Sequence, residues 1–226
     1  MDLIDRATIL AFHTDRIEEF GTGTAEALGW KTPESQQRRF DVLAEIGDLN
    51  DRSVLDVGCG HGDMRAYLGS TFPRLHYAGI DQMKPFLEVA AARYGDWPNT
   101  AFYLGDFSTV TLPEVDYVLA SGAMGYRSRE PDFVFQMITR LFGVCRLGFG
   151  FNLLRRVAHP DGILAAYEPA PIVAHCRRLT PHVVLREDYL EDDFTVFLYR
   201  ERDARHASPY PRNPGIGGED AGETAS

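Results

Sequence analysis

Three glycines alternate with other residues in the segment Asp56-Val57-Gly58-Cys59-Gly60-His61-Gly62. They follow an apolar run, and since glycine has no Cβ, this spacing lets a backbone turn sharply and lets a ligand approach closely. Ligands of open α/β sheets bind beyond the carboxyl ends of the strands, where such a turn is expected. A glycine-rich turn alone is equally typical of a tight connection that binds nothing.

Three carboxylates stand at matching places along the chain. Asp56 lies in the glycine segment, Asp81 ends the run Tyr77–Asp81, and Asp106 precedes Phe107. Asp81 is placed to accept two ribose hydroxyls, and Asp106 to accept an adenine amino group while Phe107 packs beside the base. Asp56 is placed to orient an ammonium group. Each carboxylate alone is more often a solvated strand-end residue, but three after successive strands favour a nucleoside site.

Apolar runs and helical periods alternate over most of the chain. Strands are predicted at 54–57, 77–80, 100–104, 116–120, 148–153, 182–186 and 194–199. Helices are predicted at 61–69, 84–94 and 172–178, with a long amphipathic segment that keeps Val134, Ile138, Leu141 and Cys145 on one face. This alternation predicts an α/β fold with a mostly parallel sheet of about seven strands. The short connection 187–193 predicts a C-terminal antiparallel hairpin at one edge.

The first fifty residues are predicted to be helical. Leu3, Ala7 and Leu10 fall on one face of a first helix. A second helix is predicted to begin at Thr32-Pro33 and to bury three apolar residues before Gly47 ends it, namely Phe40, Leu43 and Ile46. We expect a helical lid at 1–49 and a catalytic domain at 50–202. Residues 203–226, rich in Gly, Pro, Ser and charge, are expected to form a disordered tail.

Taken together, these features of the sequence resemble the class I S-adenosylmethionine-dependent methyltransferases, with their Rossmann-like fold. The run 54–63 is similar to their first motif, Gly79-Ile-Asp81 to their acidic second-strand end, and Gly105-Asp106-Phe107 to their adenine contact. Asp116-Tyr-Val-Leu-Ala-Ser121 resembles their fourth strand. The resemblance covers roughly residues 40 to 200 and includes a bacterial subgroup whose acceptors are mostly unassigned.

The resemblance implies S-adenosylmethionine as cofactor and S-adenosylhomocysteine as coproduct. It implies a cofactor site made of Asp56, Gly58, Cys59, Gly60, Gly62, Asp81, Gln82, Asp106, Phe107, Ser121 and Gly122. Arg39 is the further candidate, as a bidentate clamp on the cofactor carboxylate, although solvated helix charges explain it equally well. Tyr126, after the fourth strand, and His13, on the expected lid, are the candidate catalytic residues. Packing on the next helix is an equal alternative for Tyr126.

Methyl transfer is an in-line displacement in which positioning does most of the work. A base is needed only if the acceptor must lose a proton. The fourth strand ends in Ala120-Ser-Gly-Ala123 rather than in the [DNS]-P-P-[YFW] motif of many amino-group methyltransferases that act on nucleobases or glutamine. A small molecule or peptide metabolite is therefore the expected acceptor. No metal site is expected.

Composition bounds the remaining possibilities. The chain has 226 residues and a formal charge of −10, which disfavours nucleic acid and anionic membranes as partners. Three scattered cysteines, an N-terminus without signal-peptide character and the lack of a long apolar run predict a cytoplasmic protein. The oligomeric state cannot be read from the sequence.

Two alternatives remain open. An NAD-dependent oxidoreductase also uses glycines and an acidic second-strand end, but its G-x-G-x-x-G pattern requires glycine where this chain has Asp63. A protein that binds the nucleoside without catalysis would need the same site.

Overall fold

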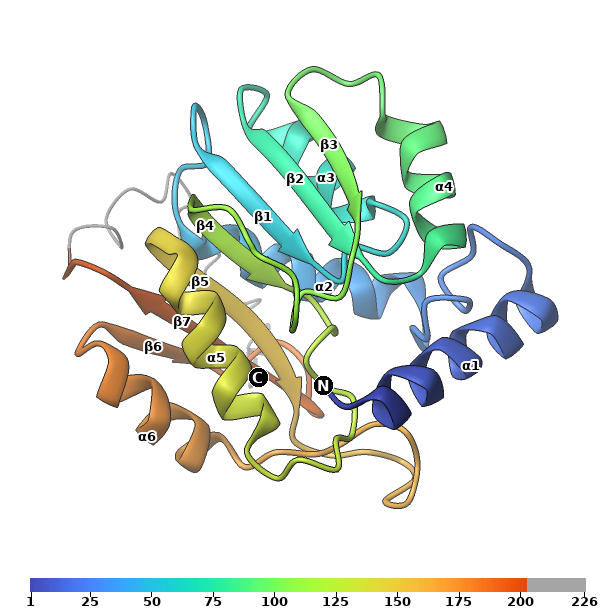
Figure 1. The fold of residues 1–226 in the computed structure, drawn as a ribbon. Coiled ribbons are helices and arrows are strands. Elements are labelled where there is room, and N and C mark those ends of the chain that lie inside the picture. Colours follow the sequence, from blue (N-terminus) through green and yellow to red (C-terminus); the bar gives the residue numbers. More distant parts are fainter. Residues whose placement is uncertain (203–226) are drawn as a thin grey trace, which may run out of the picture.

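The computed structural model describes residues 1–202, which form one seven-stranded sheet flanked by helices (Figure 1). The strand order is β3-β2-β1-β4-β5-β7-β6. The strands are β1 (Ser53–Val57), β2 (His76–Asp81), β3 (Thr100–Leu104), β4 (Val115–Ala120), β5 (Cys145–Leu154), β6 (Val183–Arg186) and β7 (Asp193–Tyr199). The helices are α1 (Leu3–Phe20), α2 (Pro33–Leu43), η1 (Ala44–Ile46), α3 (Asp63–Thr71), α4 (Lys84–Tyr94), α5 (Phe133–Val144) and α6 (Pro169–Leu179).

Strands β1 to β5 pair in parallel, and β7 pairs antiparallel with both β5 and β6. The predicted α/β class, the seven strands and the C-terminal hairpin are therefore confirmed. Because β7 lies between β5 and β6, the strand that forms the sheet edge is β6. Parallel strands place their carboxyl ends at one edge, so the loops after β1 to β5 all open on the same side of the molecule.

Two apolar cores cover the two faces of the sheet. On one face, α2, η1 and α3 contribute Phe40, Leu43, Ile46 and Leu68 to the core. On the other, α5 and α6 pack a larger core against the central strands (Figure 1). Helix α4 contacts β2, β3 and α3. Within the predicted lid, α2 and η1 thus form part of the core of the sheet domain, whereas α1 lies beside the carboxyl ends of the strands.

Local sequence signals set the helix starts in the N-terminal segment. The Asp2 carboxylate accepts the N–H of Asp5 at 2.7 Å and caps α1, and the Thr32 hydroxyl accepts the N–H of Ser35 at 3.1 Å and caps α2. Side-chain oxygens of this kind satisfy N–H groups that have no partner within the helix. Pro33 occupies the first turn of α2, as predicted.

The buried face of α1 differs from the predicted one. Its buried residues are Asp5, Ile9 and His13, whereas Leu3 and Ala7 are exposed. The physical reason is that α1 packs on loops at the end of the sheet. These loops offer polar groups as well as apolar ones. A second difference is at Cys145, predicted to close an amphipathic helix but found as the first residue of β5.

The expected disordered tail at 203–226 lies outside the described residues. Within residues 1–202, no helix combines the length and apolar character that a membrane crossing requires.

Two leucines at strand positions test the packing of the sheet. Leu119, in β4, is fully buried, and Leu104, in β3, is 61% exposed. We expect Leu119→Ala to lower the free energy of unfolding by about 2–5 kcal/mol, because it leaves a cavity in the core between the sheet and helices α2 and α3. The matched change Leu104→Ala should cost less than about 1 kcal/mol. Urea unfolding followed by circular dichroism measures both, and equal losses would contradict the assigned core.

Candidate functional site

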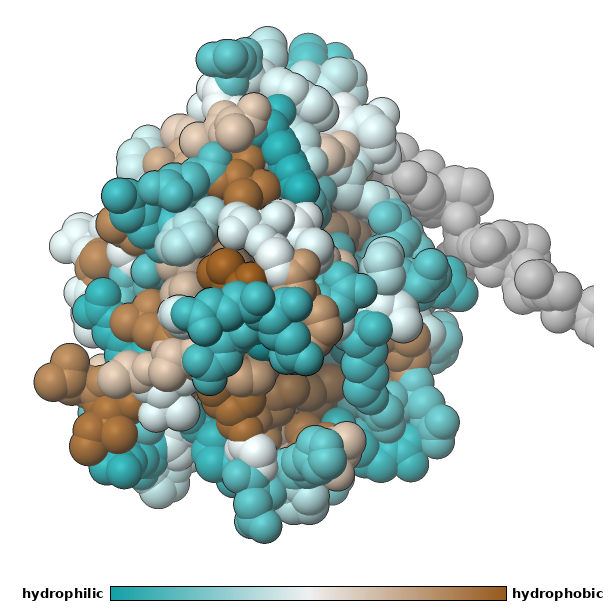
Figure 2. Space-filling model, turned by 90° about the vertical axis from the view of Figure 1, so that its right-hand side faces the viewer, coloured by the Kyte–Doolittle hydropathy of each residue, from teal (hydrophilic) through white to brown (hydrophobic). Residues whose placement is uncertain are grey.

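A cavity of about 410 Å³ lies at the carboxyl ends of β1 to β5. Its floor comes from the strand ends and the loops that follow them, and its roof from α1 and the connection between α1 and α2. Figure 2 shows the side of the molecule that α1 and α4 flank, where hydrophobic residues are exposed between hydrophilic ones. Residues far apart in the sequence therefore meet around one enclosed volume.

The glycine turn after β1 forms one wall of this cavity. Gly58 and Gly60 have positive φ angles of 70° and 53°. A Cβ on Gly58 would lie 2.4 Å from the Cβ of Ala123, and one on Gly60 would lie 2.6 Å from Leu28 Cδ2. Both the backbone conformation and the close approach of neighbouring loops therefore require glycine at these two positions.

Asp81, at the end of β2, holds the glycine turn in place. Its Oδ2 accepts the N–H of Gly60 at 2.9 Å, and its Oδ1 accepts the N–H of Met83 at 2.8 Å. Burial raises the pKa of the Asp81 carboxyl, while these backbone hydrogen bonds act in the opposite direction. Asp81 thus supports the wall of the cavity and also lines it.

Asp56, in β1, is buried and lines the cavity. Its Oδ2 accepts the hydroxyl proton of Tyr77 at 2.5 Å. Burial raises the pKa of Asp56 to about 7, and the neighbouring Asp81 carboxylate contributes in the same direction. A cation bound beside Asp56 would favour its ionised form, so this carboxyl suits a positively charged ligand group.

Several buried polar atoms along this edge have no hydrogen-bond partner among residues 1–202. They include Asp106 Oδ2, Gln82 Oε1, Ser121 Oγ and Asn152 Nδ2, and all four residues line the cavity. The other atoms of two of these groups are engaged, since Asp106 Oδ1 accepts the N–H of Ser108 and Asn152 Oδ1 accepts the N–H of Gly122. A buried polar group without a partner is costly, so these atoms mark hydrogen-bonding positions for a ligand.

His13 and Tyr126, 113 residues apart, meet at the roof of the cavity. His13 Nδ1 lies 3.1 Å from the carbonyl oxygen of Ala27, and Nε2 lies 2.7 Å from the hydroxyl oxygen of Tyr126. Because a carbonyl can only accept, Nδ1 carries the proton and Nε2 accepts from the tyrosine hydroxyl. Burial lowers the pKa of His13 and raises that of Tyr126. The histidine is therefore neutral near pH 7, with its basic nitrogen on the tyrosine.

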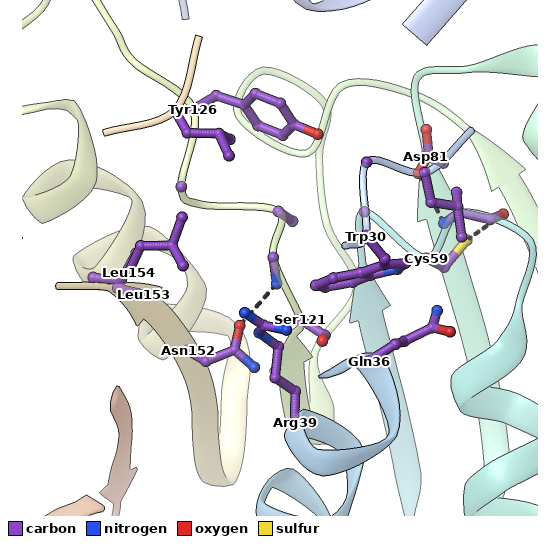
Figure 3. Close-up of a pocket in the computed structure, with 18 of the residues that line it drawn as sticks. Trp30, Gln36, Arg39, Cys59, Asp81, Ser121, Tyr126, Asn152, Leu153 and Leu154 are labelled. Atoms are coloured by element: carbon purple, nitrogen blue, oxygen red, sulfur yellow. Dashed lines mark hydrogen bonds between the residues drawn. The ribbon is translucent and has the colours of Figure 1, made fainter. Parts of the chain in front are cut away.

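Arg39 also lines the cavity, but its charge is already paired. It donates hydrogen bonds to the carboxylate of Asp193, at the start of β7, and to the carbonyl oxygen of Ser35. Its guanidinium also lies 4.9 Å from the centre of the Trp30 ring (Figure 3). The predicted role of Arg39 as a clamp on a ligand carboxylate stays a prediction, and its observed partner is within the protein.

Most residues predicted for the site line this one cavity, namely His13, Arg39, Asp56, Gly58, Cys59, Gly60, Asp81, Gln82, Asp106, Phe107, Ser121, Gly122 and Tyr126. Gly62 is not among the lining residues. It precedes α3, and a Cβ there would meet the rings of Phe102 and Tyr94. Its glycine is explained by the packing of the turn into the helix.

Other lining residues escaped the sequence analysis, among them Met83 and Trp30, Gln36 and Asn152, which Figure 3 labels. Asn152 carried a signal, since it is a polar residue inside the apolar run of β5. Trp30 carried none, because its place in the cavity depends on how the connection between α1 and α2 folds back over the sheet. No group of three or more potential metal-ligating side chains occurs within residues 1–202.

Comparison with known proteins yields a family match over the glycine turn and the following strands. Residues 54–145 match a family model described as a methyltransferase domain. The Mycobacterium tuberculosis protein Rv1506c is 28% identical over 155 residues, which cover 65% of this chain and 92% of that protein. Its name describes it as a methyltransferase on a provisional basis.

A second relative, the trans-aconitate 2-methyltransferase of Methylobacterium radiotolerans, is 30% identical over 62% of this chain. The chain spans 46% of the length of that relative. Among solved structures, magnesium protoporphyrin IX methyltransferase from Synechocystis PCC 6803 with bound SAH has a TM-score of 0.64 at 15% identity, covering 87% of this chain and all of the other. At this identity the likeness concerns the fold.

The buried carboxyl of Asp56 generates a prediction on pH and stability. Its pKa is about 7 in the folded protein against an ordinary value of 3.8 for an aspartate, so the folded state keeps a proton that the unfolded state releases. Stability from this group is present below about pH 4 and is lost as the pH rises to about 7. For ligand-free protein, we expect the free energy of unfolding relative to Asp56→Asn to fall by up to about 4 kcal/mol across this window.

Urea unfolding at several pH values measures this difference. The exposed Asp15 provides the matched control, since Asp15→Asn should keep the pH dependence of the unchanged protein. Parallel pH curves for Asp56→Asn and the unchanged protein would show that the Asp56 carboxyl is already ionised in the fold.

Proposed function

We propose that this chain is a class I S-adenosylmethionine-dependent methyltransferase, supported by the methyltransferase-domain match over residues 54–145 and the relatives named above, and that it methylates a small organic acceptor held between the end of β5 and helix α1. The observation that carries the proposal is the set of unpartnered buried polar atoms at the carboxyl edge of the sheet, beside an apolar region and a histidine–tyrosine pair. The donor site and the acceptor site are then two parts of one cavity.

The residues at this edge fit the cofactor. Asp106 Oδ2 is buried without a partner and suits the amino group of an adenine, with Phe107 beside the base. Asp81 suits the ribose hydroxyls, since a carboxylate oxygen that accepts one backbone N–H keeps a further acceptor position. Asp56 suits the ammonium end. Ser121 Oγ and Asn152 Nδ2 supply donors for the carboxylate end.

When bound, S-adenosylmethionine supplies an electrophilic methyl group on a sulfonium. The protein's task is then to place the nucleophile of the acceptor in line and to exclude water, and holding reactants in this way can contribute about 7–11 kcal/mol. Helix α1 and the connection around Trp30 cover the cavity and so exclude water. Gly58 and Gly122 let the cavity walls pack closely, since a Cβ there would lie 2.4 Å from the Cβ of Ala123 and 2.7 Å from the Trp30 ring.

The His13–Tyr126 pair provides a route for a proton that leaves the acceptor. In this route the acceptor O–H or N–H gives its proton to the hydroxyl oxygen of Tyr126, while the Tyr126 hydroxyl proton passes to Nε2 of His13. The contact between Nδ1 and Ala27 fixes the tautomer that this route requires. The lowered pKa of His13 keeps the base unprotonated near neutral pH.

The oxidoreductase alternative has less support. Asp63 stands where the dinucleotide motif requires its third glycine. It begins α3, and its side chain pairs with Arg93 and Gln36, so the backbone at this position lacks the close packing that a glycine would allow. A measurement of S-adenosylmethionine turnover distinguishes the non-catalytic alternative from an enzyme. A nucleoside-binding protein would bind S-adenosylmethionine and S-adenosylhomocysteine but would not convert one into the other in the presence of metabolites.

Asp106 gives a direct test of the cofactor site. We expect Asp106→Asn to weaken S-adenosylhomocysteine binding by about ten- to a hundredfold, since the loss of a charged hydrogen-bond acceptor amounts to about 1.5–3 kcal/mol. Isothermal titration calorimetry measures the affinity, and the exposed substitution Asp15→Asn serves as control. Unchanged affinity in Asp106→Asn would remove Asp106 from the site.

Tyr126 tests the proton route. Tyr126→Phe should lower kcat by about a hundredfold or more while S-adenosylhomocysteine affinity stays constant, because only acid–base chemistry is lost. The assay follows S-adenosylhomocysteine formation with fractionated metabolite pools, in which mass spectrometry identifies the methylated product. His13→Gln should give a similar loss. A change in cofactor affinity with unchanged kcat would instead place Tyr126 in the donor site.

A further inference from the structure

We propose that the acceptor is an apolar molecule without carboxylate groups, uncharged or cationic, that presents a hydroxyl or an amine to Tyr126. This inference rests on the proposed function and concerns the part of the same cavity that the cofactor leaves free. It follows from how apolar surface and charge are divided within the cavity lining.

Most of the leucines in the cavity lining lie on the side opposite the cofactor carboxylates, where the charged residues Glu191, Asp192 and Asp193 are paired with cations. The carboxylates predicted to hold the cofactor follow β1, β2 and β3. Leucines line the opposite side, where β5 ends and the later loops return, namely Leu153, Leu154, Leu164 and Leu190. Figure 3 shows Leu153 and Leu154 across the cavity from Cys59 and Asp81, with Tyr126 between the two sides at its upper end. An apolar acceptor body would bury these leucines.

The Tyr126 hydroxyl is fixed at the boundary between these sides. The segment around Leu164 pairs with the loop that carries Tyr126, through a bridge between Tyr126 and Leu164 and a hydrogen bond from the Ala165 N–H to the Gly125 carbonyl at 2.8 Å. The same loop therefore presents one hydrogen-bonding group and apolar surface beside it. An apolar molecule with one hydroxyl or amine matches this arrangement.

Charge distinguishes among such acceptors. Six carboxylates line the cavity, from Asp56, Asp81, Asp106, Glu191, Asp192 and Asp193. Within residues 1–202, only two lysine or arginine side chains line it, and each already contacts a carboxylate. Arg39 pairs with Asp193, and Lys31 Nζ lies 3.7 Å from Asp192 Oδ2. Arg156, outside the lining, pairs with both Glu191 and Asp192. Among the described lining residues, the carboxylates without a cationic partner are therefore those on the cofactor side, Asp56, Asp81 and Asp106.

The two remaining basic groups of the lining are also engaged. The N-terminal ammonium of Met1 donates to Ser108 Oγ at 3.2 Å, and His13 uses both ring nitrogens. An acceptor carboxylate would therefore find no unpaired lysine or arginine in the described lining, and the unpaired carboxylates on the cofactor side would repel it. Transfer of an ionised carboxylate from water to such a place is strongly unfavourable, whereas a neutral or cationic acceptor avoids this cost.

A matched pair of probes tests the inference on the full chain saturated with S-adenosylhomocysteine. 2-Naphthol and 6-hydroxy-2-naphthoate share a ring system and a hydroxyl and differ by one carboxylate. We expect 2-naphthol to bind at least about tenfold more tightly, because the carboxylate would be desolvated without a partner. Isothermal titration calorimetry measures both affinities. Equal affinities, a preference for the naphthoate or failure of 2-naphthol to bind would each overturn the proposal.

Two pairs of variants locate the effect in the cavity. Asp192→Asn removes a rim carboxylate, leaves Lys31 without its partner and leaves Arg156 paired with Glu191 alone, so it should raise naphthoate affinity about threefold or more at low salt. Asp188→Asn, on the same loop but outside the lining, should not. Leu154→Gln should weaken 2-naphthol binding several-fold, and Leu3→Gln, at an exposed leucine outside the lining, should leave it unchanged. Equal effects within either pair would place the probe outside the cavity.

S-adenosylhomocysteine affinity separates this inference from the function on which it rests. A chain that fails to bind S-adenosylhomocysteine contradicts the proposed function. A chain that binds it and prefers the naphthoate contradicts the acceptor class alone.

Discussion

The carboxylate of Asp81 joins two loops, and the geometry of the whole cavity depends on this junction. It accepts the N–H of Gly60 from the turn after β1 and the N–H of Met83 from the loop after β2. Both N–H groups would otherwise be left without partners in a buried place, at a cost of about 1–3 kcal/mol each. The parallel pairing of β1 and β2 brings the two loops together. One side chain thus shapes the glycine turn and also lines the cavity.

The sheet domain was largely predictable because its signals are local. Helix α4 (Lys84–Tyr94) and strand β3 (Thr100–Leu104) have the predicted bounds, since each is an apolar period closed by turn residues. The carboxylates Asp56, Asp81 and Asp106 were predictable for a different reason. Parallel strands end at one edge of a sheet, so residues after successive strands must come together even when 25 residues separate them.

The roof of the cavity was not predictable in this way, because long-range polar contacts determine it. The apolar residues of α1 suggested a face with Leu3, Ala7 and Leu10, but the helix buries Asp5, whose carboxylate accepts the hydroxyl of Ser128 and the N–H of Arg129. Similarly, Arg39 looked free for a ligand, but Asp193, 154 residues later, pairs with it. The hydrophobic periodicity of a single helix or strand does not predict such long-range polar partners.

In the proposed proton route, the His13–Tyr126 hydrogen bond makes removal of the acceptor proton depend on closure of the cavity by α1. Helix α1 fully buries only one apolar residue, Ile9, beside the polar Asp5 and His13, and its half-buried Leu10 and Ile17 pack against a small cluster of Ala27, Met83 and Phe86. A helix with so little fully buried apolar surface separates more easily than one packed into a main core. In the proposed mechanism, the base reaches Tyr126 and the roof shields the cavity from water only when α1 is in place. Displacement of α1 would then remove both conditions together, and the acceptor would not be activated in an open site.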